Sequence, residues 1–236
     1  MNNIRVAKIP SEMNWPCRGA AVVIDVLRAT TVITQGIANG AAEVVVFGEI
    51  DQVRALGNTS PKPLLCGERA CKPIDGFDLG NSPSEYDRQR VGGKRLVMTT
   101  TNGTRAAIAA AGFDTIYAAS FNNLASVVSA LASESEISIV CAGTDGEVTD
   151  EDLLLAGAIL DRLSYKGDDV AAMDVFKLWQ SFQASGISLA EYLGNTLGGR
   201  NLIAAGYQND ILFCAQVDTT TALPTVKSRD PITFGG

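Results

Sequence analysis

The sequence predicts an α/β fold with a largely parallel or mixed sheet. Short apolar runs rich in Val and Ile alternate with alanine-rich stretches along most of the 236 residues, which is the pattern of successive β-α-β units. Several runs are apolar on both faces, as buried parallel strands are. With 46% hydrophobic residues, the chain can form a substantial core. Its length is compatible with a single domain or with two small intertwined α/β halves.

The apolar runs are the expected strands, and the alanine- or leucine-rich stretches between them are the expected helices. The strands are Ala21–Val26, Glu43–Phe47, Pro63–Cys66, Arg95–Thr99, Thr115–Ala118, Ile137–Ala142 and Ile211–Ala215. The helices are Ala29–Asn39, Ile50–Leu56, Thr104–Ala111, Leu124–Ser133, Asp150–Ser164, Val170–Ser185, Ser188–Leu193 and Gly198–Ala205. Because no strand interrupts residues 170–206, we expect a helical cluster there, which is a candidate lid.

The segment from Cys71 to Arg90 breaks this regularity. It carries Gly, Pro, Asn and Asp at turn spacing and has little periodicity, so we expect a long ordered loop. Long loops within compact domains are commonly functional. No Ser-, Pro- or Gly-rich linker and no repeat of fixed period divides the chain.

Charge and composition exclude several classes of protein. The chain has 19 Lys+Arg, 26 Asp+Glu and no His, for a net charge of −7. We therefore expect no nucleic-acid partner, and acid–base chemistry must use carboxylates, thiols, lysines, tyrosines or hydroxyls. No run approaches the ~18 apolar residues of a membrane span. We expect a cytoplasmic protein without a membrane partner, whose five cysteines are mostly reduced core residues.

Acids and arginines follow two predicted strands where each strand ends. Asp25 and Arg28 flank the end of one, and Glu68 and Arg69 follow another. In open α/β sheets the ligand crevice lies outside the carboxyl ends of the strands. An acid beside an arginine suits a metal ion and its anionic ligand, and equally a structural ion pair. Two arginines at one rim would make forked contacts with a phosphate, sulfonate or carboxylate group.

The run from Thr99 to Thr104 is the feature best suited to a bound oxyanion. It offers hydroxyls, backbone N–H groups and the positive end of a helix dipole. The alternative is an Asn-Gly turn followed by a helix cap at Thr104. The residues concerned are Thr100, Thr101, Asn102, Gly103 and Thr104.

Further candidates lie near the ends of other elements. Glu151 and Asp152 open a predicted helix, where Thr149 and Asp152 fit a capping box, and Asp210 precedes the last predicted strand. Cys141 ends a strand, and is either an activated nucleophile or a small core thiol. Two phosphatase signatures are absent. No arginine lies six positions after Cys66 or Cys141, as a protein-tyrosine-phosphatase loop requires, and Asp25 lacks the second aspartate of haloacid dehalogenases.

Six segments, each weak alone, stand in order along most of the chain. They are VVIDVLRATTVI (Val22–Ile33), CGER (Cys66–Arg69), GFDLGNSPSEY (Gly76–Tyr86), MTTTNGTRA (Met98–Ala106), TDEDLLLAG (Thr149–Gly157) and NDILFCAQVD (Asn209–Asp218). Together they resemble the 2-phosphosulfolactate phosphatase family of coenzyme M biosynthesis. The resemblance implies a Mg²⁺-dependent hydrolase that converts 2-phospho-3-sulfolactate to 3-sulfolactate and phosphate. It also implies a three-layer α/β/α sandwich, neither a Rossmann dinucleotide-binding fold nor a haloacid-dehalogenase fold.

With the residues at the strand ends, the resemblance implies a set of site residues. The expected catalytic residues are Asp25, Arg28, Glu68, Arg69 and Asp152. The expected substrate- or phosphate-binding residues are Asn81, Ser82, Thr100, Thr101, Asn102, Gly103, Thr104 and Cys141. The expected ligands of Mg²⁺, which prefers oxygen donors, are Asp25, Glu68, Glu151, Asp152 and Asp210. Asp25 is expected to be a metal ligand or general base, with an aspartyl-phosphate nucleophile as the alternative.

Other functions remain compatible with these residues. One is a phosphatase for another small phosphorylated carboxylic acid, and a second is a binding protein without turnover. A Mg²⁺-dependent phosphotransferase would normally carry a nucleotide loop such as GxxxxGK, and none is present. An edge of the sheet or the helices of residues 170–206 are the candidate surfaces for a homodimer.

Overall fold

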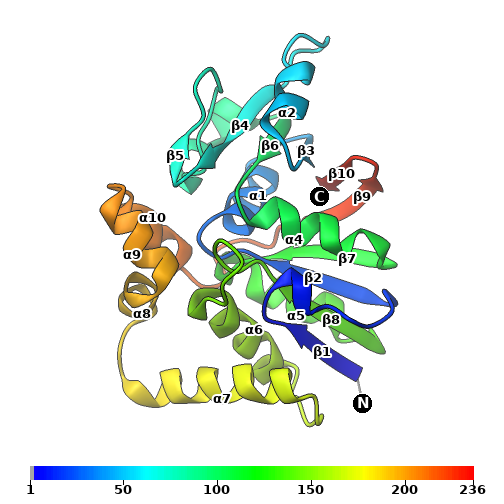
Figure 1. Ribbon diagram of the computed structural model, residues 1–236, viewed down its shortest axis with the longest axis vertical. Coiled ribbons are helices and arrows are strands. Elements are labelled where there is room, and N and C mark those ends of the chain that lie inside the picture. Colours follow the sequence, from blue (N-terminus) through cyan, green and yellow to red (C-terminus); the bar gives the residue numbers. More distant parts are fainter. Residues whose placement is uncertain (1–2) are drawn as a thin grey trace.

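The computed structural model describes residues 3–236, in which the strands form one mixed sheet with helices on both faces (Figure 1). The α/β prediction is confirmed. The order across the sheet is β1-β8-β2-β7-β9-β10-β3-β6-β4-β5. The strands are β1 (Asn3–Ala7), β2 (Ala20–Ile24), β3 (Glu43–Val46), β4 (Leu64–Arg69), β5 (Lys72–Pro73), β6 (Arg95–Thr99), β7 (Thr115–Ala119), β8 (Glu136–Cys141), β9 (Thr225–Arg229) and β10 (Ile232–Gly235).

The sheet consists of two parallel parts joined by a hairpin. In the first part β1, β8, β2 and β7 pair in parallel, and in the second part β3, β6 and β4 do so. The hairpin β9–β10 lies between them and pairs antiparallel to β7 on one side and to β3 on the other. Because three successive antiparallel pairings separate β7 from β3, the two parts run in opposite directions.

Three hydrophobic clusters of the described residues, two large and one small, are covered by helices. They are α1 (Ala29–Ala38), α2 (Ile50–Leu56), α3 (Arg88–Val91), α4 (Gly103–Ala109), α5 (Leu124–Leu131), α6 (Asp150–Arg162), α7 (Val170–Ser185), α8 (Leu189–Asn195), α9 (Leu197–Ala204) and α10 (Gln208–Cys214). In β2, Ala20, Val22 and Ile24 pack with α5, α6 and α7, whereas Ala21 and Val23 pack with α1 and α4. Burial on both faces explains why this strand is apolar throughout.

The structure differs from the sequence prediction in one predicted strand and in four strands that were not predicted. The predicted strand Ile211–Ala215 is wrong, because this run lies in helix α10. Ile211 and Cys214 are buried there while Leu212 is 59% exposed, which is the spacing of a helix with one buried face. The strands of the hairpin β9–β10, together with β1 and β5, were not predicted.

Other predicted features are present. Residues 170–206 are helical, as α7, α8 and α9. The segment from Cys71 to Arg90 contains the short strand β5, a 3-10 turn at Pro83–Glu85 and the start of α3, and is otherwise irregular. Within residues 3–236 no helix combines the length and the hydropathy that a bilayer span needs.

Candidate active site

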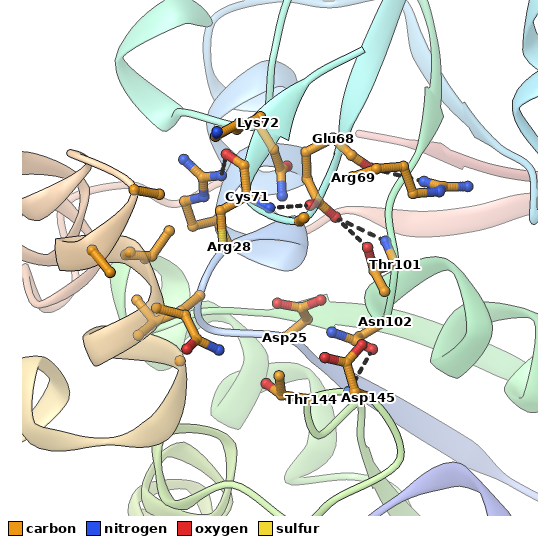
Figure 2. A pocket seen from close by; sticks show the side chains of 18 residues that line it. Asp25, Arg28, Glu68, Arg69, Cys71, Lys72, Thr101, Asn102, Thr144 and Asp145 are labelled. Carbon is orange, nitrogen blue, oxygen red and sulfur yellow. Dashed lines mark hydrogen bonds between the residues drawn. The ribbon is translucent and has the colours of Figure 1, made fainter.

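A pocket of about 560 Å³ opens where the two parts of the sheet face helix α9 (Figure 2). In a flat sheet, opposed strands would place their carboxyl ends at opposite edges. Twist of roughly 20–25° per strand pair accumulates over the six pairings between β2 and β4, and turns these ends toward one side. The lining residues are Asp25, Leu27, Arg28, Glu68, Arg69, Ala70, Cys71, Lys72, Asn81, Thr101, Asn102, Thr144, Asp145, Gly198, Asn201, Leu202, Ala204 and Ala205.

Asp25 follows β2 directly and lies between the first turns of α1 and α4. Its Oδ1 accepts a hydrogen bond of 3.1 Å from the backbone N–H of Ala29, at the start of α1. Gly103 begins α4, and a Cβ atom at that position would lie 2.6 Å from Asp25 Oδ2. Only glycine therefore allows α4 to approach the carboxylate this closely. The positive ends of both helix dipoles face this group.

Burial raises the pKa of Asp25 from its ordinary value of 3.8 to about 7. The Ala29 N–H and the positive charge of Arg28 act in the opposite direction, while the charges of Glu68 and Glu151 raise the pKa further. A carboxyl group with this pKa exists in both protonation states near neutral pH. It is therefore suited to proton transfer, or to binding a cation that favours its ionised form.

Asp152 holds the ends of two strands together behind the pocket. Its Oδ1 accepts a 2.8 Å hydrogen bond from the N–H of Val26, and its Oδ2 accepts bonds from the N–H groups of Ala142 and Gly143 at 3.2 and 3.0 Å. The predicted capping box is wrong: the Thr149 side chain makes no cap hydrogen bond, because Asp152 reaches the strands instead of its own helix terminus. Burial, followed by the Asp25 charge, raises the pKa of Asp152 well above its ordinary value.

Glu151 is buried beside the first turn of α9 and does not line the pocket. A Cβ atom at Gly198, in that turn, would collide with its carboxylate, so the helix can pack here only because residue 198 is glycine. Burial raises the pKa of Glu151. Glu151 thus supports the wall of the pocket that α9 forms.

Glu68 connects the loop after β6 to the turn between β4 and β5. Its Oε1 accepts hydrogen bonds from the N–H and the hydroxyl of Thr101, at 2.8 and 3.0 Å. Its Oε2 accepts a 2.8 Å bond from the N–H of Cys71. Both oxygens of this pocket-lining carboxylate are therefore used to position backbone.

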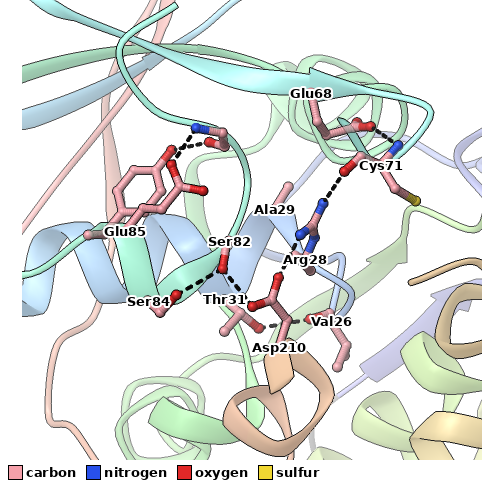
Figure 3. Close-up of polar contacts among 12 residues, drawn as sticks. Val26, Arg28, Ala29, Thr31, Glu68, Cys71, Ser82, Ser84, Glu85 and Asp210 are labelled. Carbon is pink, nitrogen blue, oxygen red and sulfur yellow. Dashed lines mark hydrogen bonds and ion pairs between the residues drawn. The ribbon is translucent and has the colours of Figure 1, made fainter. Parts of the chain in front are cut away.

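Arg28 forms a buried ion pair with Asp210 of α10 (Figure 3). Its Nη1 lies 2.6 Å from Asp210 Oδ2, and its Nη2 donates to the carbonyl of Cys71 at 3.0 Å. The guanidinium also lies over the ring of Tyr207, 4.5 Å from the centroid. The other oxygen of Asp210 accepts a 2.6 Å bond from the hydroxyl of Ser82. These contacts fasten α10 and the irregular segment to the pocket.

Arg69 does not join Arg28 in this conformation. Its Nη2 donates to the Thr99 hydroxyl at 2.9 Å and to the Gly48 carbonyl at 3.1 Å, and its Nη1 donates to the carbonyl of Glu68. In Figure 2 its guanidinium points away from the pocket. The forked contact of two arginines with one anion stays a prediction.

The threonine run divides into half-buried residues that line the pocket and fully buried ones. Thr101 and Asn102 line the pocket, and Asn102 Oδ1 accepts a 3.1 Å bond from the N–H of Asp145. Thr100 and Thr104 are buried and bonded to each other. Helix α4 begins at Gly103, so Thr104 is not its cap.

Of the remaining predicted residues, Asn81 lines the pocket, whereas Ser82 and Cys141 do not. The buried Oδ1 of Asn81 has no hydrogen-bond partner among the described residues. Ser82 is buried and reaches the site only through Asp210. Cys141 is fully buried in β8 and is not brought to the pocket. Burial raises the pKa of its thiol well above the ordinary value, which disfavours the thiolate a nucleophile needs.

Four polar residues that line the pocket were not among the predicted site residues: Lys72, Thr144, Asp145 and Asn201. Thr144 and Asp145 follow the predicted strand Ile137–Ala142, so their position at a strand end was the available signal. Lys72 lies in the irregular segment already marked as functional, three positions after Arg69, and that position was the available signal. Asn201 lies on α9, and nothing in the local pattern distinguishes it from other exposed polar residues of a helix.

The carboxylates do not form a closed metal cage. Among residues 3–236, no three Asp, Glu or Cys side chains are arranged to share one metal ion. Asp25 Oδ2 and the Asp145 carboxylate line the pocket and accept no hydrogen bond from the described chain. Among the described residues of the pocket lining, these carboxylate oxygens remain open to a cation or to substrate.

Comparison with known proteins places this site in a family. The sequence profile of 2-phosphosulpholactate phosphatase matches residues 5–229. Relatives from several organisms carry the name probable 2-phosphosulfolactate phosphatase. The one from Thermotoga petrophila is 41% identical over 89% of both chains. That from Symbiobacterium thermophilum is 42% identical over 86% of this chain and 89% of its own. That from Deinococcus radiodurans is 39% identical over 98% of this chain and 96% of its own. The chain belongs to the 2-phosphosulfolactate phosphatase family of phosphoric monoester hydrolases.

Proposed function

We propose that the protein hydrolyses 2-phospho-3-sulfolactate to 3-sulfolactate and phosphate and that it requires Mg²⁺. The observation that carries the chemistry is Asp25, a buried carboxylate in the pocket wall, between two helix N-termini and with a pKa of about 7. The substrate is the one in the names of the relatives and of the matching family.

The pocket residues fit Mg²⁺ as a phosphoryl-transfer site commonly binds it. Such sites use one or two carboxylates and leave the other positions to water and substrate phosphate. Asp25 Oδ2 and the carboxylate of Asp145 would hold the ion, since both are open in the pocket wall. When bound, Mg²⁺ would neutralise the negative charge of the phosphoryl oxygens.

The chain itself orients the substrate and handles the proton. The first turns of α1 and α4 favour negative charge beside Asp25. In the ionised form, Asp25 offers Oδ2 to the cation, and its alternative role as base toward the attacking water needs the same form. The burial of Asp152 and Glu151 behind it excludes water from that side of the carboxylate.

The test is phosphate release from racemic 2-phospho-3-sulfolactate, compared with phospholactate and phosphoglycolate, in Mg²⁺ and in EDTA. Asp25→Asn is the variant. The matched control is Asp51→Asn, at an exposed aspartate in the first turn of α2. We expect turnover that depends on Mg²⁺, prefers the sulfonated substrate and is lost in Asp25→Asn only.

Each other outcome would change the proposal in a defined way. Turnover of only the unsulfonated acids would leave a phosphatase with another small phosphorylated carboxylic acid as substrate. Binding without any turnover would favour the non-catalytic alternative. Equal rates in Mg²⁺ and EDTA would overturn the metal requirement. A cytoplasmic location and a homodimer stay predictions.

A further inference from the structure

Lys72 is a pocket-lining cation whose charge has no partner within residues 3–236. It is exposed in β5, and its Nζ makes no hydrogen bond or ion pair with the described chain. The two arginines of the pocket are already engaged. Arg28 pairs with Asp210, and Arg69 is held by the Thr99 hydroxyl and nearby carbonyls. Lys72 is therefore available to an anion that enters the pocket.

A turn of unusual backbone conformation holds Lys72 at this place. Ala70 and Cys71, which connect β4 to β5, have φ values of 50° and 64°, in the left-handed region that residues other than glycine rarely adopt. A hairpin turn with two such residues normally uses Asn-Gly. Here the Cys71 peptide is fixed from both sides: its N–H donates to Glu68 and its carbonyl accepts from Arg28. The site itself therefore sets where the chain returns with Lys72.

Lys72 and Asp25 lie on opposite sides of the pocket. Figure 2 shows Asp25, Asn102 and Asp145 along one side and Lys72 across from them, beyond Cys71. A substrate whose phosphate lies beside Asp25 would direct its far end toward Lys72. In 2-phospho-3-sulfolactate, that far end is the sulfonate. Its sulfur is one bond further from the phosphorylated carbon than the carboxylate carbon is.

We propose that Lys72 binds the sulfonate group and thereby selects sulfonated substrates. This inference rests on the proposed function, whose substrate it explains. A sulfonate stays ionised across the pH range of folded proteins and presents three acceptor oxygens. A lysine ammonium carries three donors and one positive charge. The match of charge and donor number makes Lys72 a residue that determines specificity.

The test compares two substrates that differ only in the sulfonate, 2-phospho-3-sulfolactate and phospholactate. In Lys72→Gln, we expect kcat/KM for the sulfonated substrate to fall about 10- to 100-fold, mainly through KM, because one hydrogen bond to a charged group is lost. The value for phospholactate should change little. Lys72→Arg should retain most of the selectivity. The control is Lys62→Gln, at an exposed lysine outside the pocket, which should behave as wild type.

Equal losses for both substrates, or an unchanged ratio of their kcat/KM values, would overturn the role of Lys72. Calorimetric titration with 3-sulfolactate and with lactate, in EDTA, separates this inference from the proposed function. Suppose that wild type binds 3-sulfolactate more tightly than lactate, that Lys72→Gln loses this preference, and that no phosphate is released. The proposed hydrolysis is then wrong, while the sulfonate contact of Lys72 is supported. If turnover occurs and Lys72→Gln keeps the preference, only the sulfonate contact fails. Wild-type binding without any preference for 3-sulfolactate would also overturn it.

Discussion

The two parts of the sheet bring different chemistry to the same pocket. From the first part comes Asp25, a buried carboxyl group in the pocket wall whose pKa burial raises to about 7. Behind it lies Asp152 of α6, whose pKa burial also raises. From the second part comes Glu68, whose two oxygens are both hydrogen-bonded to the chain, and beside it lie Arg69 and Lys72. One part carries Asp25, which changes protonation near neutral pH. The other carries groups that fix backbone and offer positive charge.

A single strand end could not provide both a buried carboxylate with a raised pKa and the positive charge that an anionic substrate needs. A carboxylate with open oxygens and a raised pKa needs burial among other acids, which repels an anionic substrate. A substrate with three anionic groups needs donors and cations. Placing the acids on one part and the turn with Lys72 on the other keeps both environments within one cavity.

The largest expected effect is the loss of catalysis when Asp25, at the end of the first part of the sheet, is replaced. Asp25→Asn should lower kcat for phosphate release by about 10²- to 10⁴-fold, the range for loss of a group that acts on the reacting centre. Glu68→Gln should lower kcat far less, because its oxygens position backbone. Steady-state kinetics of both purified variants is the measurement. An equal loss of kcat in the two variants would contradict the division of roles.

The next effect concerns the ion pair that fastens α10 to the pocket. Arg28→Met should lower the free energy of unfolding by about 3–5 kcal/mol, because it leaves the buried Asp210 charge without its partner. Urea denaturation measures this value. The double variant with Asp210→Asn should lose less than the two single variants combined. Strictly additive losses would show that the pair contributes no coupling.

The pH dependence of stability should distinguish the parts as well. Because the pKa of Asp25 rises from 3.8 to about 7 on folding, the folded state keeps a proton that the unfolded state releases between these values. This contribution is complete below about pH 4 and is lost as pH rises through about 7. The Asp25→Asn variant has no carboxyl group at this position, so its stability does not fall in this way. Between pH 4 and pH 8 its free energy of unfolding, relative to that of wild type, should therefore rise by about 2–4 kcal/mol.

Urea unfolding in EDTA across that pH range measures the difference between the two proteins. Asp51→Asn, at the exposed aspartate of α2, should follow wild type at every pH. A difference between Asp25→Asn and wild type that does not change with pH would show that the Asp25 pKa is the same in the folded and unfolded states.

The smallest expected effect belongs to the second part. Thr101→Val removes one hydroxyl that donates to Glu68 and should cost about 1 kcal/mol of unfolding free energy. The N–H of Thr101 still donates to the same oxygen, so the loop should keep its place and kcat should stay near wild type. A loss of kcat as large as that of Asp25→Asn would assign the loop a direct role in catalysis.

The strands buried on both faces could be predicted from sequence, because a run such as that of β2 is apolar at every position. Helix α10 could not, because a run of seven residues gives too few turns to separate the periods of helix and strand. Asp25, directly after β2, and Glu68, near the end of β4, were found from their position at strand ends. The hydrogen bond from Val26 to Asp152 joins residues 126 positions apart. The local pattern could show only a possible helix cap at Asp152. The position of Lys72 in the pocket could not be predicted either. It depends on a turn whose residue Cys71 is held by hydrogen bonds with Glu68 and Arg28.

The hairpin β9–β10 has a consequence for the order in which the sheet can be completed during synthesis. It pairs with β7 on one side and β3 on the other, and it follows every other strand in the chain. While the ribosome has yet to release it, β7 and β3 each present an unpaired edge, which is a site for association with other chains. Closure of the pocket between the two parts therefore waits for residues 225–235, so a nascent chain would acquire its active site only after these residues have been synthesised.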